Sequence, residues 1–175
     1  MKSLQQLERL PEIFDRLRLG GHICPEDGAI YYQLRSDFES YRAAFETLGF
    51  ELAAHERGFY YFVASGELGK EASQMAVFFF VLVDALGNEG QNVREAVFEG
   101  EHTIDDLPHF RLESHRQCLS EVDIHDRDDL ETIVKRLARY GFAELRTADR
   151  FRFRPPAWRF VDLCYEAADA QEEGA

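Results

Sequence analysis

The sequence predicts a mainly α-helical protein with small β-hairpins, of the α+β class, in which two related units follow one another. Five identical residues recur at a spacing of 92 positions: Asp37, Glu39, Gly49, Phe50 and Phe59 return as Asp129, Glu131, Gly141, Phe142 and Phe151. Each copy has one apolar helix face, a glycine suited to capping that helix, and two short strand segments. A helix followed by a two-stranded ribbon is the second half of a winged helix-turn-helix. We therefore predict a tandem winged-helix protein.

The repeat sets the expected domain boundaries. With 175 residues the chain is long enough for two small domains, and its 45% hydrophobic content excludes a mostly disordered protein. We expect a first winged-helix unit over 1–66, a second over 67–168, and a frayed acidic tail over 169–175.

In the first unit, leucines spaced for a helix lie between 4 and 19, and Pro11 suits the first turn of that helix. A turn over 24–28 and a short helix over 29–35 follow. Ser36 or Asp37 is a suitable N-cap for the repeated helix. The wing strands are expected over 50–55 and 59–63.

In the second unit, residues 70–90 predict one long helix. Its middle, 75–83, is apolar on every side, which is typical of a helix buried all round. A buried strand is the competing interpretation, because valine and phenylalanine also favour strands. The following segments are expected as a short helix or strand (93–98), a helical turn (103–107), a helix (112–119), the repeated helix (126–140), the second wing, and a last helix (157–168).

The formal net charge of −13 and the sequence pI of about 4.9 argue against a general nucleic-acid coat, so any DNA contact must be local. The three cysteines are widely spaced, residues 1–20 contain no apolar segment typical of a signal peptide, and no stretch is long enough to span a bilayer. These features predict a cytoplasmic protein with reduced thiols.

The two copies differ in charge. From Lys135 to Arg159 there are eight basic and two acidic residues, on the outer face of the repeated helix and along the second wing. A basic helix face beside a basic wing suits a DNA backbone. The predicted DNA-contacting residues are Lys135, Arg136, Arg139, Arg146, Arg150, Arg152 and Arg154. The alternative interpretation is a solvated strand and helix face.

The first copy carries aromatic residues where the second has arginine. The 92-residue alignment sets Tyr60 and Phe62 opposite Arg152 and Arg154, and so predicts that both aromatic side chains point outward, where another chain would cover them. Phe78, Phe79 and Phe80 are further candidates for a partner contact, with plain core as the alternative. Excess apolar surface also predicts a homodimer.

Signals for catalysis or a cofactor are weak. His115-x-x-Cys118 is the only His/Cys pair at close zinc-ligand spacing in the sequence, and no second pair completes a zinc site. His22 and Cys24 flank a turn but alternate across it. The sequence contains no P-loop, G-x-G-x-x-G or G-x-S-x-G motif. We expect no catalytic residues, no metal and no cofactor.

An ordered set of segments resembles the MksE family, the small subunits of MukBEF-like bacterial condensins. The matching segments are 10–14 (LPEIF), 22–28 (HICPEDG), 48–52 (LGFEL), 55–62 (HERGFYYF), 140–142 (YGF) and 151–156 (FRFRPP). The resemblance implies a dimeric tandem winged-helix protein that binds an MksF/MukF-like kleisin. Through the kleisin it would join an MksB/MukB-like SMC ATPase that entraps DNA, in chromosome organisation and segregation or in plasmid defence.

Three functions follow as hypotheses. The first is a non-catalytic accessory subunit of such a complex, nucleoid-associated, with weak and sequence-independent contact to double-stranded DNA. The second is a dimeric winged-helix transcription regulator, which would need base-reading side chains on its recognition helix. Lys135, Arg136 and Arg139 favour phosphate contact instead. The third is an enzyme.

Overall fold

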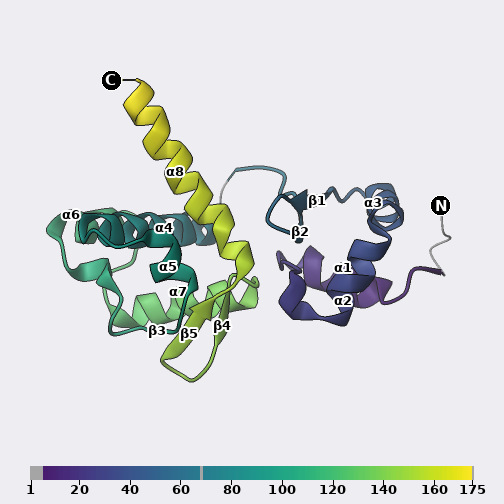
Figure 1. The fold of residues 1–175 in the computed structure, drawn as a ribbon, viewed down its shortest axis with the longest axis horizontal. Helices are drawn as coiled ribbons and strands as arrows, with labels where there is room; N and C mark the ends of the chain where they lie inside the picture. The colour runs from purple at the N-terminus through teal and green to yellow at the C-terminus, as the bar shows by residue number, and fades with distance from the viewer. Residues whose placement is uncertain (1–5, 68, 175) are drawn as a thin grey trace. The chain divides into compact units, whose positions relative to one another are not determined.

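The computed structural model describes residues 6–67 and 69–174, with the side chain of Glu173 excepted. The chain divides into two compact units, Met1–Gly66 and Glu67–Ala175 (Figure 1). Both are mainly helical and both contain a small antiparallel sheet, which confirms the predicted fold class. None of the described helices combines the length and apolar composition needed to cross a bilayer.

The first unit has the order of a winged helix-turn-helix. Its elements are α1 (Leu10–Arg18), η2 (Pro25–Asp27), α2 (Ala29–Ser36), α3 (Phe38–Thr47), β1 (Leu52–His55) and β2 (Phe59–Phe62). Pro11 lies in the first turn of α1, as predicted. Ile23 pairs with Tyr60, so a third short extended segment joins the wing hairpin. The core gathers buried side chains from all three helices, including Ile13, Leu34 and Phe45.

The second unit repeats this order with additions. Its elements are α4 (Lys70–Asn88), α5 (Val93–Phe98), β3 (His102–Thr103), η3 (Pro108–Phe110), α6 (Glu113–Ser120), α7 (Arg127–Arg139), β4 (Ala143–Leu145), β5 (Arg150–Phe153), η4 (Pro155–Ala157) and α8 (Trp158–Glu173). The sheet order is β3-β5-β4, all antiparallel. The long segment is a helix rather than the alternative strand.

Two segments of the second unit differ from their predicted bounds. Residues 102–103 pair with β5 as an edge strand that was not predicted, and the predicted capped turn follows, with the Asp106 amide donating to the Thr103 hydroxyl and the Leu107 amide to the Ile104 carbonyl. The last helix runs on to Glu173, through residues that were expected to fray.

Helix α4 is buried on most of its surface. Phe78, Phe79 and Val81 are fully inaccessible, but Phe80 is 48% exposed. The prediction of burial all round therefore fails along one line of the helix, because no described element of this unit covers Phe80.

The two wings differ by one residue. Gly49 and Gly141 both have positive φ, 82° and 84°, and the next amide donates to the corresponding helix carbonyl in each unit. After that point the spacing falls from 92 to 91: Leu52 pairs with Phe62 as Ala143 pairs with Phe153. The first unit thus has one additional residue before β1. Since alternate strand residues face opposite sides, this single residue reverses the predicted facing of the first wing.

Candidate surfaces for DNA and for a partner protein

Helix α7 would be the recognition helix of the second unit. Asp126 caps it by accepting from the Asp129 amide at 3.0 Å, and the Asp129 carboxylate accepts from the Asp126 amide at 3.3 Å. The buried face carries Leu130, Ile133, Val134 and Leu137, as predicted. Lys135 and Arg139 are therefore exposed on the other side.

All three cations of this outer face are engaged within the unit. Lys135 Nζ lies 2.6 Å from Glu131 Oε1. The Arg136 guanidinium donates to Gln74 Oε1 at 2.6 Å and lies 3.3 Å from Glu71 Oε1. Arg139 Nη2 lies 3.0 Å from Glu71 Oε2. The basic helix face predicted from the sequence is thus largely neutralised by acidic residues of α4 and α7.

Glu71 is the centre of this network. It accepts a hydrogen bond from the Tyr140 hydroxyl at 2.6 Å, and this bond, with the nearby Arg136 and Arg139, lowers the pKa of the Glu71 carboxyl. The same hydrogen bond raises the pKa of Tyr140. The network ties the first turn of α4 to the last turn of α7.

The wing cations differ in their accessibility. Arg152 pairs with Glu144, its cross-strand neighbour, at 2.5 Å and 2.7 Å. Arg146 lies 3.1 Å from Glu144 and 3.5 Å from Glu101. Arg154 is only 8% exposed, so its predicted outward position was wrong. Arg150 is exposed at the wing turn and forms no ion pair with any residue that the structure describes.

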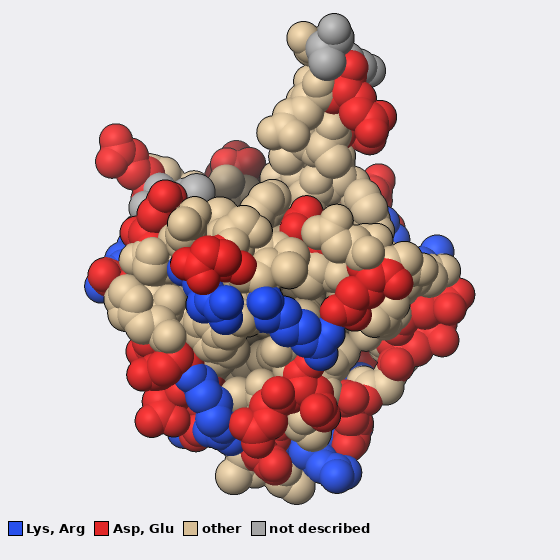
Figure 2. Space-filling model, turned by 90° about the vertical axis from the view of Figure 1, so that its left-hand side faces the viewer, with Lys and Arg blue, Asp and Glu red and all other residues tan. Residues whose placement is uncertain are grey.

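The charge distribution follows from these pairs. Figure 2 shows Lys and Arg side chains beside Asp and Glu side chains over the face in view, without a continuous basic patch. Of the seven predicted DNA-contacting residues, Arg150 alone combines exposure with a free guanidinium among the described residues. Sequence reasoning missed the acidic partners Glu71 and Glu144. Glu131 and Lys135, four apart on one helix, were the visible signal for such pairing.

The predicted partner-contacting residues fall into two groups. Tyr60 is 8% exposed, so its predicted outward position was wrong. Phe62 packs against Phe45 and Phe14 and is partly exposed. Phe78 and Phe79 are inaccessible in the core of the second unit. Phe80 remains available to another molecule. The binding role of these residues stays a prediction.

No described group of three or more His, Cys, Asp or Glu side chains has the arrangement of a metal site. His115 is buried and its Nε2 lies 2.7 Å from Asp84 Oδ2, which uses the ring for a contact between α6 and α4. His22 stacks on Tyr61 beside the first wing, with ring centroids 5.5 Å apart. These histidines have roles in packing.

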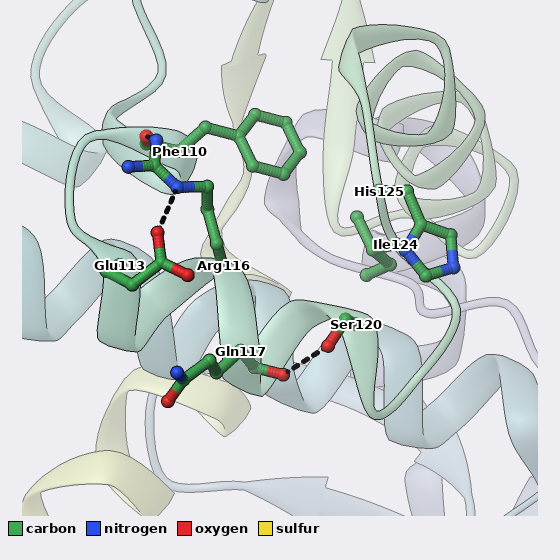
Figure 3. Close-up of a pocket in the computed structure, with 7 residues that line it drawn as sticks. All are labelled: Phe110, Glu113, Arg116, Gln117, Ser120, Ile124 and His125. Atoms are coloured by element: carbon green, nitrogen blue, oxygen red, sulfur yellow. Dashed lines mark hydrogen bonds and ion pairs between the residues drawn. The ribbon is translucent and has the colours of Figure 1, made fainter.

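A shallow pocket lies along α6 in the second unit (Figure 3). It has a volume of about 270 Å³, and its lining includes Arg116, Glu113 and His125. The Arg116 guanidinium donates to Glu113 at 3.0 Å and to the Phe110 carbonyl, so its charge is already compensated. The residues drawn in Figure 3 include no pairing of a nucleophile with a base.

Comparison with known proteins gives one positive result. No curated protein matches the chain significantly. Residues 8–165, which span both winged-helix units, match the family described as condensin complex protein MksE. The chain belongs to the MksE family of condensin complex proteins.

Proposed function

We propose that the chain is a non-catalytic accessory subunit of a MukBEF-like SMC–kleisin complex and that it joins this complex by binding the kleisin. The observation that carries the proposal is the family match over residues 8–165, which includes the helix-turn-helix and wing of each unit. The exposed apolar side chains Phe80 and Leu19 support the proposal, because another protein chain could cover them.

DNA contact is the second part of the proposal, and it is limited to the wing turn of the second unit. Arg150 supports it, since this guanidinium is exposed and not paired with a described acid. The alternative of a transcription regulator is disfavoured by the same geometry. In α7 the cations are held by Glu131, Gln74 and Glu71, and in α3 the exposed residues include Glu39 and Glu46. Neither recognition helix presents a free cationic face to a major groove.

The experiment is reconstitution with the products of the neighbouring genes. The purified chain should form a stable complex with the kleisin, and through it with the SMC ATPase, on size-exclusion chromatography with light scattering. The chain alone should hydrolyse no ATP. A chain that binds neither subunit, but binds one palindrome tightly, would establish the regulator instead.

The homodimer stays a prediction. In the second unit, Phe80 is 48%, Leu163 58% and Tyr165 43% exposed, and a second copy would cover such side chains. Light scattering of the free chain at tens of micromolar measures its mass directly. A monomer at that concentration contradicts the dimer and leaves the kleisin hypothesis intact.

A further inference from the structure

Each unit has a cluster of three aromatic residues at equivalent positions beside and on its wing. In the first unit these are Phe14 on α1, Phe50 after α3, and Phe62 on β2. Phe50 corresponds to Phe142, because each follows the capping glycine and donates its amide to the preceding helix. Phe62 corresponds to Phe153 through the wing pairing.

The third position is fixed by packing. Phe14 contacts Phe62 with ring centroids 6.1 Å apart, and Phe79 contacts Phe153 at 5.2 Å. The preceding residues, Ile13 and Phe78, are both inaccessible. Phe14 and Phe79 therefore occupy equivalent places on the first helix of each unit.

The equivalent residues differ in burial. In the second unit Phe79, Phe142 and Phe153 are 0%, 4% and 2% exposed. Helix α8 explains this, because its Phe160 stacks on Phe79 at 4.8 Å and packs edge-on against Phe142 at 4.9 Å. In this unit a helix with one aromatic anchor closes the cluster.

The described residues of the first unit include no counterpart of α8. Residues 63–67 follow β2 without forming a helix. Phe14, Phe50 and Phe62 remain partly exposed, although Phe50 leans onto both other rings at 5.1 Å and 4.9 Å. We call these three residues the aromatic face of the first unit. It is the surface on which α8 would lie if the first unit had a counterpart of α8.

Acidic residues beside the aromatic face indicate the charge of the segment that would bind there. Phe50 also lines a surface pocket of about 400 Å³, together with Glu46, Glu51 and Arg42, whose guanidinium lies 2.6 Å from Glu39. The carboxylates of Glu46 and Glu51 are exposed, and neither forms an ion pair with another described residue. A helix lying here would gain from lysine or arginine beside its apolar stripe.

The same charges argue against α8 of a second copy. The exposed half of α8 contains Asp162, Glu166 and Asp169, and residues 162–172 include no lysine or arginine. Like charges placed against Glu46 and Glu51 would oppose docking. The occupant is therefore a different sequence.

We infer that the aromatic face of the first unit is the docking site for an amphipathic helix of the kleisin, which carries a large aromatic or aliphatic anchor flanked by basic side chains. The inference rests on the proposed function for the identity of the partner. The binding mode follows from the second unit, where helix α8 lies on the equivalent aromatic residues.

The test measures the affinity of the intact chain for the full-length kleisin encoded with it, by titration calorimetry. Phe50→Ala removes the centre of the face and should weaken binding about tenfold or more, as expected for an aromatic anchor. Glu46→Lys with Glu51→Lys should weaken binding by about three- to tenfold. This double variant should also lose most of the salt dependence seen in the wild type.

Matched controls lie elsewhere in the first unit. Tyr32→Ala removes a 60% exposed aromatic side chain on α2, and Glu56→Lys reverses an exposed charge in the wing turn. Both should bind the kleisin as the wild type does. The charge variants alter exposed residues only, so they keep the test decisive if Phe50→Ala destabilises the unit.

The outcomes separate the two proposals. A wild-type chain that does not bind the kleisin overturns the proposed function together with this inference. Wild-type binding that is unchanged by both Phe50→Ala and the double charge variant overturns the docking site alone. Loss of self-association in Phe50→Ala, with kleisin binding intact, assigns the face to a second copy and also overturns the inference.

Discussion

The glycines after α3 and α7 have nearly the same φ, 82° and 84°, yet the two copies of the repeat diverge immediately after them. One additional residue in the first unit changes which side chains of the wing face inward, and α8 gives the second unit a cover that the first unit lacks. In the second unit, α8 covers the aromatic cluster, and most of the predicted DNA-contacting cations are paired with acids of the same unit. In the first unit, the corresponding rings stay partly exposed, and Glu46 and Glu51 form no ion pair with a described residue. The two copies thus share one architecture but differ in how much of the aromatic cluster and charge each unit covers by itself.

Acid should act strongly on the second unit, through His109. Burial lowers the pKa of His109 from 6.5 to about 4, and its Nε2 is hydrogen-bonded to the Phe78 carbonyl at 2.9 Å. The unfolded chain therefore binds a proton at higher pH than the folded chain does. The free energy of unfolding should be constant above about pH 6.5 on this account and fall by up to about 3 kcal/mol as the pH approaches 4.

Urea denaturation at pH 7 and pH 4.5 measures this effect, followed by the fluorescence of Trp158, the chain's single tryptophan, which stacks on Phe98 in the second unit. His109→Gln should lower stability at pH 7 but flatten the pH dependence. An equal decline in the variant and the wild type would show that another group is responsible.

Removal of the Phe160 ring from α8 should leave the aromatic cluster of the second unit partly exposed, as it is in the first unit. Phe160→Ala exposes Phe79 and Phe142 and should lower the free energy of unfolding by about 2 kcal/mol, less than for a fully buried phenylalanine because Phe160 is partly exposed. The same fluorescence assay measures it. Leu163→Ala, on the exposed side of the same helix, should change stability by less than about 0.5 kcal/mol. Similar losses in both variants would contradict the assigned role of Phe160.

Substitution of the acidic partners should free the paired arginines of the second unit. Glu71→Gln with Glu144→Gln should release Arg136, Arg139 and Arg152 from their carboxylate partners. If the released side chains reach phosphates, the slope of log affinity against log salt for duplex DNA should steepen by about two to three. Fluorescence anisotropy at several salt concentrations measures the slope. An unchanged slope would mean that these arginines point away from DNA even when free.

The smallest expected change concerns the wing turn. Arg150→Glu should flatten the same salt slope by about one unit for the assembled complex, with kleisin binding retained. Arg152→Gln is the matched control, because Arg152 is already paired with Glu144 and should change the slope little. Equal effects of the two substitutions would argue against Arg150 as the phosphate contact.

Local patterns in the sequence were sufficient for the fold, but not for its surfaces. The repeat, the capping glycines and the apolar spacing gave the helices and wings because each depends on neighbouring residues. The facing of Tyr60 and Phe62 depended on one residue between Gly49 and Leu52, which no periodicity marks. The pairing of Arg136 with Glu71 joins residues far apart in the chain. Such contacts follow from tertiary structure, so a run of basic residues was mistaken for a basic surface.

Helix α8 continues well past its last inaccessible residue, Val161. Its final turns contain acidic residues, including Asp169 and Glu172, and its last turn has no basic residue. Negative charge near a helix C-terminus opposes the peptide dipoles, so these turns are held against an unfavourable local field. Protonation of the carboxylates or the approach of a cationic surface would relieve that repulsion and stabilise the last turns of the helix. The end of α8 is thereby sensitive to the charge of whatever lies next to it.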